Sequence, residues 1–168
     1  MGYVEDLRKI VGHRPLIFVG AVTIIINEVG HILLQQRQFP KGVWGLPGGL
    51  MELGESTEQV AKREVFEETA LQIEDLKLIN VYSGENHFIK AKNGDEFYVV
   101  TVAYYTTNVK GRIKVDVEES MKIEYFPIND LPSEMVGSHR AIIEDFTLLN
   151  NEKVREQLGL CNEKWITK

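Results

Sequence analysis

Runs of apolar residues along the chain predict several β-strands. Residues 16–26 (LIFVGAVTIII) form a continuous, largely β-branched run that is typical of a strand buried on both faces. Turn residues at 27–30 separate it from a second run at 31–36 (HILLQQ), so the sequence predicts a β-hairpin here. Two later runs, residues 76–84 and 96–107, the second of them rich in Val, Tyr and Thr, predict strands that complete a mixed sheet.

The spacing of apolar residues also predicts three helices. The first covers residues 4–11. The second, at residues 57–69, begins after Ser56, a good N-cap that forms a capping box with Gln59. The third covers residues 138–149, and its inner face is expected to carry Ile142, Ile143, Phe146 and Leu149.

The helix predicted at residues 57–69 carries carboxylates on its apolar side. With about 100° between successive residues, Glu64, Glu67 and Glu68 fall on the stripe that is marked by Val60, Ala61 and Leu71. An acidic run is ordinarily a solvated face, but such a face lies opposite the apolar residues instead of among them. Carboxylates this close repel one another, and a divalent cation removes the repulsion. Because oxygen ligands suit Mg²⁺ or Mn²⁺ better than Zn²⁺, the stripe predicts a magnesium or manganese site.

The same stretch carries a family resemblance. Gly49, five residues, Glu55, seven residues and then residues 63–71 (REVFEETAL) resemble the box of the Nudix (MutT-like) hydrolases, G-x5-E-x7-R-E-U-x-E-E-x-G-U with U apolar. Every fixed position matches except one, because Ala70 stands where the family has glycine. The flanking segments WGLPGG and EYFPINDLP are also similar to the family, so the resemblance covers residues 16–131.

The resemblance implies both a fold and a reaction. The fold is α/β, a Nudix-type α/β/α sandwich around a mixed β-sheet. The reaction is hydrolysis of a diphosphate bond in a nucleoside diphosphate linked to another moiety, with Mg²⁺ or Mn²⁺ as cofactor. The choice between nucleoside triphosphates, ADP-ribose, nucleotide sugars and dinucleoside polyphosphates stays open. Residues 86–88 (NHF) stand where ADP-ribose members tend to have proline and diadenosine members tyrosine.

The resemblance also assigns roles to individual residues. The expected metal ligands are Glu64, Glu67, Glu68, Glu119 and the carbonyl of Gly48. Glu64 is the candidate that accepts the proton of the attacking water, and Glu119, with Glu118 as its alternate, competes for that role. Arg63 is expected to orient a glutamate through a bidentate pair, while Glu55 braces the loop before the helix.

Residues close to the box provide further candidates. Arg37 and Lys41 are the nearest cations for a diphosphate, and Arg37 is favoured because a strand end positions it better than a loop does. Residues 48–49, two glycines, let the backbone approach another group closely. Trp44 is a candidate for stacking on the substrate, although packing is the favoured interpretation. For His139, a structural or surface role is favoured over that of a proton carrier.

Composition and charge narrow the classes of partner. The 168 residues are 43% hydrophobic and 26% charged, which predicts one domain over residues 1–168, with residues 1–14 as an N-terminal helical appendage and residues 138–160 as a C-terminal helix. The net charge of −6 argues against nucleic acid and against an anionic membrane as partners. The single Cys161 and the lack of a signal-peptide pattern predict a cytoplasmic protein. The N-terminal helix and the Phe-rich strands leave room for a homodimer.

An alternative from another functional class is a regulatory module that has the same fold and senses a nucleotide without cleaving it. Such a module has no need of the box glutamates. Because this chain has all of them, hydrolysis is the favoured interpretation. The two hypotheses differ in whether a nucleotide ligand is turned over or only bound when Mg²⁺ is present.

Overall fold

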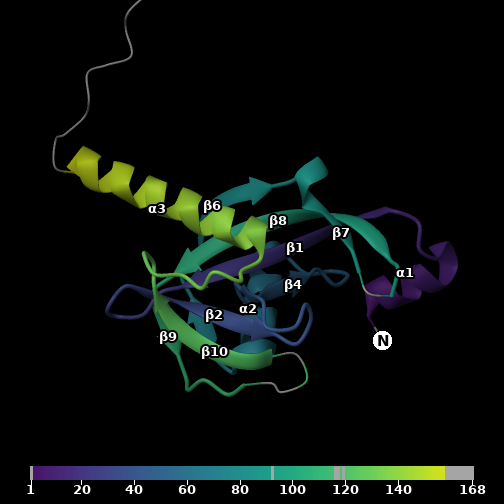
Figure 1. Ribbon diagram of the computed structural model, residues 1–168, viewed down its shortest axis with the longest axis horizontal. Helices are drawn as coiled ribbons and strands as arrows, with labels where there is room; N and C mark the ends of the chain where they lie inside the picture. The colour runs from purple at the N-terminus through teal and green to yellow at the C-terminus, as the bar shows by residue number, and fades with distance from the viewer. Residues whose placement is uncertain (1, 92, 116–117, 119, 158–168) are drawn as a thin grey trace, which may run out of the picture.

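The computed structural model describes residues 2–91, 93–115, 118 and 120–157 (Figure 1). The predicted site residue Glu119 and the single Cys161 lie outside the described residues. The N-terminal helix α1 (Tyr3–Val11) lies at the opposite end of the molecule from the C-terminal end of α3 (Gly137–Gln157). Among the described residues, no helix combines the length and the apolar character that crossing a bilayer requires.

A mixed five-stranded sheet forms the centre of the molecule. Its strands lie in the order β4 (Gly48–Leu50), β1 (Leu16–Ile25), β8 (Glu96–Thr106) and β6 (Lys77–Tyr82), and β7 (Phe88–Lys90) also pairs with β8. β1 and β8 are parallel along their whole length, whereas the other pairs are antiparallel. The strands predicted at residues 76–84 and 96–107 are therefore confirmed, as β6 and β8.

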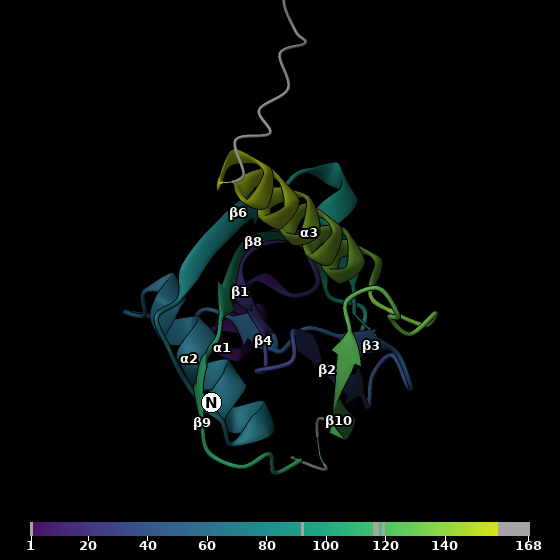
Figure 2. The same cartoon turned by 90° about the vertical axis from the view of Figure 1, so that its left-hand side faces the viewer.

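Helices cover both faces of this sheet. Neighbouring residues of β1 point to opposite sides: Ala21 packs in a cluster with Val60 of α2 (Thr57–Thr69), and Val22 packs in a cluster with Ile142 of α3. Figure 2 shows α2 and α3 on different sides of β1 and β8. The predicted α/β/α arrangement is confirmed, and the period of two in β1 explains why the strand is apolar on both faces.

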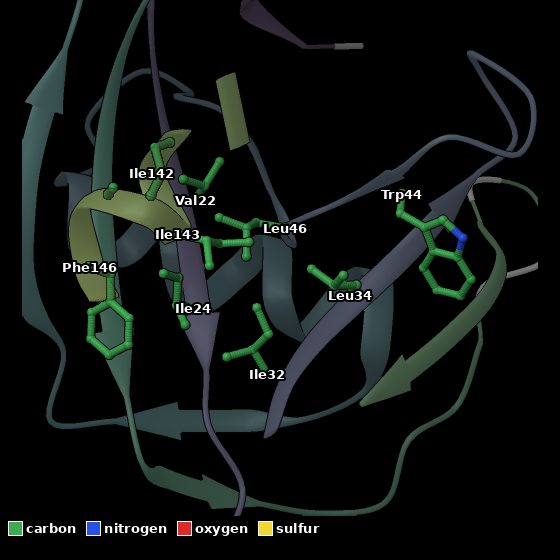
Figure 3. Packing of buried hydrophobic residues seen from close by; sticks show 10 residues of the cluster. Val22, Ile24, Ile32, Leu34, Trp44, Leu46, Ile142, Ile143 and Phe146 are labelled. Atoms are coloured by element: carbon green, nitrogen blue, oxygen red, sulfur yellow. The ribbon is translucent and has the colours of Figure 1, made fainter. Parts of the chain in front are cut away.

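The core between the sheet and α3 is built from aliphatic side chains. Figure 3 shows Ile142 and Ile143 of α3 beside Val22, Ile24 and Leu46, all of them buried. Phe146 joins the same cluster, as expected. The prediction that Leu149 also lies inside is wrong, because its side chain is 40% exposed. In Figure 1 the C-terminal part of α3 extends past the ends of the strands.

The predicted hairpin between residues 16–26 and 31–36 is also wrong. The turn forms, with Asn27 and His31 joined by a backbone hydrogen bond, but only one bridge, Ile26 to Ile32, follows it. β2 (His31–Arg37) instead pairs with β10 (Ser120–Pro127) and β3 (Trp44–Gly45) in a separate three-stranded sheet. Along β1, β8 occupies one edge throughout, whereas β4 occupies the other edge at residues 20–22. A two-stranded sheet of β5 (Gln72–Glu74) and β9 (Asn108–Lys110) completes the fold.

Helix α2 begins and ends as the sequence predicts. Ser56 and Gln59 form the expected capping box, in which each side chain accepts from the other residue's backbone N–H. The helix ends at Ala70, whose backbone is left-handed, with φ 60° and ψ 13°. A side chain in this region is strained, because its Cβ lies too close to the following carbonyl oxygen. Ala70 therefore occupies a position where glycine is favoured, and this is the position at which the Nudix box has glycine.

Ala70→Gly should raise the free energy of unfolding by about 1 kcal/mol, because glycine adopts the left-handed conformation without strain. For a chain of this size the midpoint of thermal unfolding should rise by about 2–4 °C. The matched control is Ala61→Gly, in the middle of the same helix, which should lower the stability by about 1 kcal/mol or more. A loss of stability in Ala70→Gly would show that the helix end carries no strain.

Candidate functional site

Two glycines bring β4 very close to β1 and to α2. Gly48 has φ 148°, and a Cβ built on it would lie 2.1 Å from the carbonyl oxygen of Ala21. A Cβ on Gly49 would lie 2.4 Å from the carboxyl group of Glu64. The two glycines therefore let the loop backbone contact the strand on one side and the acidic helix on the other.

Glu68 is the most buried acid of this region, with 6% of its surface exposed. Its Oε2 accepts a hydrogen bond from the backbone N–H of Gly48 at 3.0 Å, and its Oε1 accepts one from Nε2 of Gln35 at 3.1 Å. Burial raises the pKa of Glu68 to about 7, although these two hydrogen bonds act in the opposite direction. The charge of Glu64 raises it further. The site thus keeps a carboxylate partly desolvated beside the glycine loop.

Arg63 connects the other acids of the element. Its Nε and Nη2 donate to the two oxygens of Glu55 at 2.6 and 2.9 Å, which is the bidentate pair expected of this arginine. Nη1 donates to Glu64 at 2.8 Å and to Glu67 at 3.1 Å, and Nη2 also donates to the carbonyl of Leu50. The bond to Arg63 is the main reason why the pKa of Glu55 is lowered. One guanidinium therefore holds the loop, β4 and α2 together.

The donor set around the glycine loop has the chemistry of a site for a hard divalent cation. Glu64, Glu67, Glu68 and the Gly48 carbonyl offer oxygen atoms only, which favours Mg²⁺ or Mn²⁺. The buried, desolvated Glu68 is a carboxylate whose ionised form a cation would stabilise. Within the described part of the chain, no three acids, histidines or cysteines yet converge closely enough to hold an ion. Arg63 instead binds two of the acids, so metal binding requires them to reorient.

The glycine loop opens into a cleft of about 510 Å³ on the α3 side of the sheet. Gly48 and Gly49 line it together with residues of β1 and β8, among them Val22 and Thr101. Its walls come from the 39–40 loop, from η1 (Glu85–His87) and β7, and from the start of α3. Of the predicted metal ligands among the described residues, Gly48 lines this cleft, whereas Glu64 and Glu68 contact the glycine loop from α2 and are not lining residues.

Arg37 and Lys41 differ clearly in position. Arg37 lines the cleft, and its Nε is buried without a hydrogen-bond partner in the described structure. Its positive charge lowers the pKa of Glu68 and of His139. Lys41 is exposed and is absent from the lining of the cleft. The geometry thus supports the preference for Arg37 as the cation that meets an anionic substrate.

Trp44 and His139 have packing roles. Trp44 is 8% exposed, and its ring lies edge-on against Phe126 with 4.8 Å between centroids. His139 is buried, and its Nδ1 accepts a hydrogen bond from the backbone N–H of Leu46 at 2.9 Å. Burial, and secondarily the charge of Arg37, lower the pKa of His139 to about 3, so the imidazole is neutral and Nδ1 is an acceptor. These are the roles that the sequence favoured for both residues.

Sequence reasoning missed two polar residues beside Glu68. Nε2 of Gln35 donates both to Glu68 and to Oγ of Ser120, the latter at 2.6 Å. Gln35 and Ser120 are 2% and 1% exposed. A signal for Gln35 was present, because in HILLQQ it continues the inward face of the strand that begins with Leu33. A polar residue on a buried strand face indicates a specific partner.

Comparison with known proteins identifies relatives of this chain. The family described as the NUDIX domain matches residues 17–146. The ADP-ribose pyrophosphatase of Methanocaldococcus jannaschii is 31% identical over 133 residues, which cover 78% of this chain and 74% of that protein. The NAD-capped RNA hydrolase NudC of Photorhabdus laumondii is 27% identical, over 80% of this chain and 48% of that protein. The crystal structure of a MutT NUDIX hydrolase from Burkholderia pseudomallei superposes with a TM-score of 0.67 and 28% identity, over 77% of this chain and 98% of that one.

The buried Glu68 should make the metal-free protein less stable at high pH. Its pKa rises from 4.5 in the unfolded chain to about 7 in the folded one, so the folded protein binds more protons between these values and stability falls as the pH rises through them. Glu68→Gln should therefore raise the free energy of unfolding at pH 8 in EDTA by about 1–3 kcal/mol. The measurement is urea unfolding at several pH values.

The matched control for this prediction is Glu67→Gln, because the Glu67 side chain is 55% exposed. Its effect on stability should stay within about 0.5 kcal/mol at each pH. Equal pH profiles for Glu68→Gln and the unmodified chain would contradict the view that burial of Glu68 opposes its ionisation.

Proposed function

The chain belongs to the Nudix family of pyrophosphohydrolases, and we propose that it uses Mg²⁺ or Mn²⁺ to hydrolyse a diphosphate bond in a nucleoside diphosphate linked to another moiety. The observation that carries this proposal is the contact of the Gly48–Gly49 loop with Glu64 and Glu68 at the edge of the cleft. The same cleft contains the side chain of Arg37. The glycine loop thus connects the acids of α2 with the cleft that Arg37 lines, and a diphosphate bound at this loop would meet both a cation and a separate positive charge.

The cation would be held by Glu64, Glu67, Glu68 and the carbonyl of Gly48. When bound, a divalent cation neutralises phosphate charge and lowers the pKa of water. The protein's own contribution is orientation: the Gly48 N–H fixes Glu68, and Arg63 holds Glu55 against the loop. Arg37 would bind a phosphate oxygen through its guanidinium. Of the predicted ligands, Glu119 lies outside the described residues, so its part in the site rests on the resemblance alone.

Glu64 is the proposed group that accepts the proton of the attacking water. Its carboxyl group lies against Gly49 and accepts from Arg63, so it stands beside the glycine loop. Glu119 competes for this role. Carboxylates that are close together titrate as a coupled set, so the pH dependence of turnover reports on the set and not on one acid.

The walls of the cleft suit the nucleoside part of a substrate. Phe39, Ile89, Phe97 and Val99 provide apolar surface beyond the glycine loop. A base can pack on such surface while the phosphates lie at the loop. The relatives differ in what their names say they act on, ADP-ribose for one and NAD-capped RNA for another. The second moiety is therefore to be identified by assaying a panel of substrates.

Glu67→Gln should lower kcat by about 100-fold or more, because it removes a ligand charge that acts on the transition state. The side chain is 55% exposed, so the thermal midpoint should not change. The assay measures phosphate, pyrophosphate and nucleotide products with Mg²⁺ or Mn²⁺ over nucleoside triphosphates, ADP-ribose, nucleotide sugars and dinucleoside polyphosphates. Tight binding without turnover of any of these substrates would instead identify a nucleotide-sensing module.

Glu68→Gln is a better test of the metal-site assignment than Glu68→Ala. Alanine would leave the N–H of Gly48 and the amide of Gln35 buried without their acceptor. Glutamine retains an acceptor for Gly48 while it removes the charge. Glu68→Gln should therefore lose turnover as Glu67→Gln does, and full activity in both variants would refute the metal-site assignment.

Arg37→Gln should raise KM by about 10-fold or more, because it removes a charge-assisted contact with the substrate phosphates. Lys41→Gln is the matched control, since Lys41 is exposed and outside the cleft lining, and its KM should stay unchanged. Steady-state kinetics on the best substrate of the panel measures both. Equal effects of the two substitutions would show that only the overall charge matters.

A further inference from the structure

We propose that Gln35 is a positioning residue that fixes the Glu68 carboxylate beside Gly48 and thereby sets the affinity of the site for its divalent cation. This inference rests on the proposed function, in which Glu68 is a metal ligand. Gln35 belongs to β2 and lies outside the Nudix box, so the box resemblance assigns it no role.

The geometry determines which way the Gln35 amide points. Nε2 lies 3.1 Å from Oε1 of Glu68 and 2.6 Å from Oγ of Ser120. The NH₂ group of Gln35 therefore faces both partners. Both amide hydrogens are then used, one for each partner. Ser120 of β10 thus holds the amide in the orientation that Glu68 needs.

Glu68 is consequently held at both of its oxygens. Oε1 accepts from Gln35 of β2, and Oε2 accepts from the N–H of Gly48 in β4. Glu68 belongs to α2, and its carboxylate contacts β2 and β4 directly. Ser120 of β10 supports this arrangement through the Gln35 amide. A ligand that is already oriented loses less conformational freedom when the cation binds, and groups in this outer position tune metal affinity.

A packing role alone does not account for glutamine at this position. The same face of β2 carries Leu33, which packs in a buried cluster with Val65 and Ile123. A leucine or methionine would fill the space next to them. Glutamine instead leaves its Oε1 buried without a hydrogen-bond partner among the described residues, which is unfavourable. Glutamine at this position is therefore explained by the hydrogen bonds that its NH₂ group donates.

The test compares Gln35→Met with Gln36→Met, a neighbour in the same strand. Methionine retains the length of the side chain and removes the donors. Gln36 is the matched control because its Nε2 donates to the carbonyl of Gly42 and not to Glu68. Isothermal titration of Mn²⁺ into the substrate-free protein gives the metal affinity, and thermal unfolding in EDTA gives the stability. Mg²⁺ titration of turnover gives the metal dependence of kcat.

Gln35→Met should weaken Mn²⁺ binding by about 10–100-fold, while its stability in EDTA falls because Oε1 of the buried Glu68 and Oγ of Ser120 lose their partner. Turnover should recover at high Mg²⁺, and Gln36→Met should bind Mn²⁺ with unchanged affinity. Ser120→Ala, which removes only the support of the amide, should weaken binding to a smaller extent. Unchanged Mn²⁺ affinity in both Gln35→Met and Ser120→Ala would overturn the inference.

Glu68→Gln separates this inference from the function on which it rests. If Mn²⁺ binds the unmodified chain and Glu68→Gln weakens it, the metal assignment holds and the Gln35 variants test the positioning role alone. If Glu68→Gln binds Mn²⁺ as tightly as the unmodified chain does, the metal assignment fails and the positioning role falls with it.

Discussion

The close approach of the Gly48–Gly49 backbone to β1 and α2 is the constraint on which the site depends. A side chain at Gly48 would overlap the carbonyl of Ala21, and one at Gly49 would overlap the carboxyl group of Glu64. Because there is no side chain at either position, β4 can pair with β1 while its loop reaches the acidic helix. The backbone N–H of Gly48 then donates a hydrogen bond to Glu68, and the carbonyl of Gly48 is the proposed backbone ligand of the cation. The pairing of β4 with β1, the position of α2 and the orientation of Glu68 therefore all depend on these two glycines.

The electrostatics of the site show a balance between stability and function. Three carboxylates on one helix face repel one another, and the structure offsets part of this repulsion by pairing two of them with Arg63. The third, Glu68, is buried, and its burial disfavours the ionised form and raises its pKa. A divalent cation at these acids would favour the ionised form and would stabilise the folded chain. The proposed cation would thus account for acids on the apolar side of this helix.

The cleft has two ends: one is formed by the glycine loop and Arg37, and the other has apolar walls. The glycine loop, the acids and Arg37 form the end at which a diphosphate would react, and these residues come from β4, α2 and the end of β2. The apolar walls come from other elements, β7, β8 and the 39–40 loop. Relatives whose names give different substrates are consistent with this division. The family follows from the box, whereas the box by itself gives no choice of substrate.

Local patterns in the sequence were sufficient for the helix that carries the acids, for its capping box and for the buried strands, because these depend on neighbours within a few residues. The sequence also predicted a bidentate pair between Arg63 and a glutamate, and the structure identifies that glutamate as Glu55. Tertiary structure decided where β2 goes: its pattern predicted a hairpin with β1, but β2 pairs with β10 and β3 instead. It also decided that Leu149 is exposed, that Arg37 and not Lys41 reaches the cleft, and that Gln35 meets Glu68. These outcomes depend on contacts between residues far apart in the chain, here 33 positions for Gln35 and Glu68, which no local periodicity encodes.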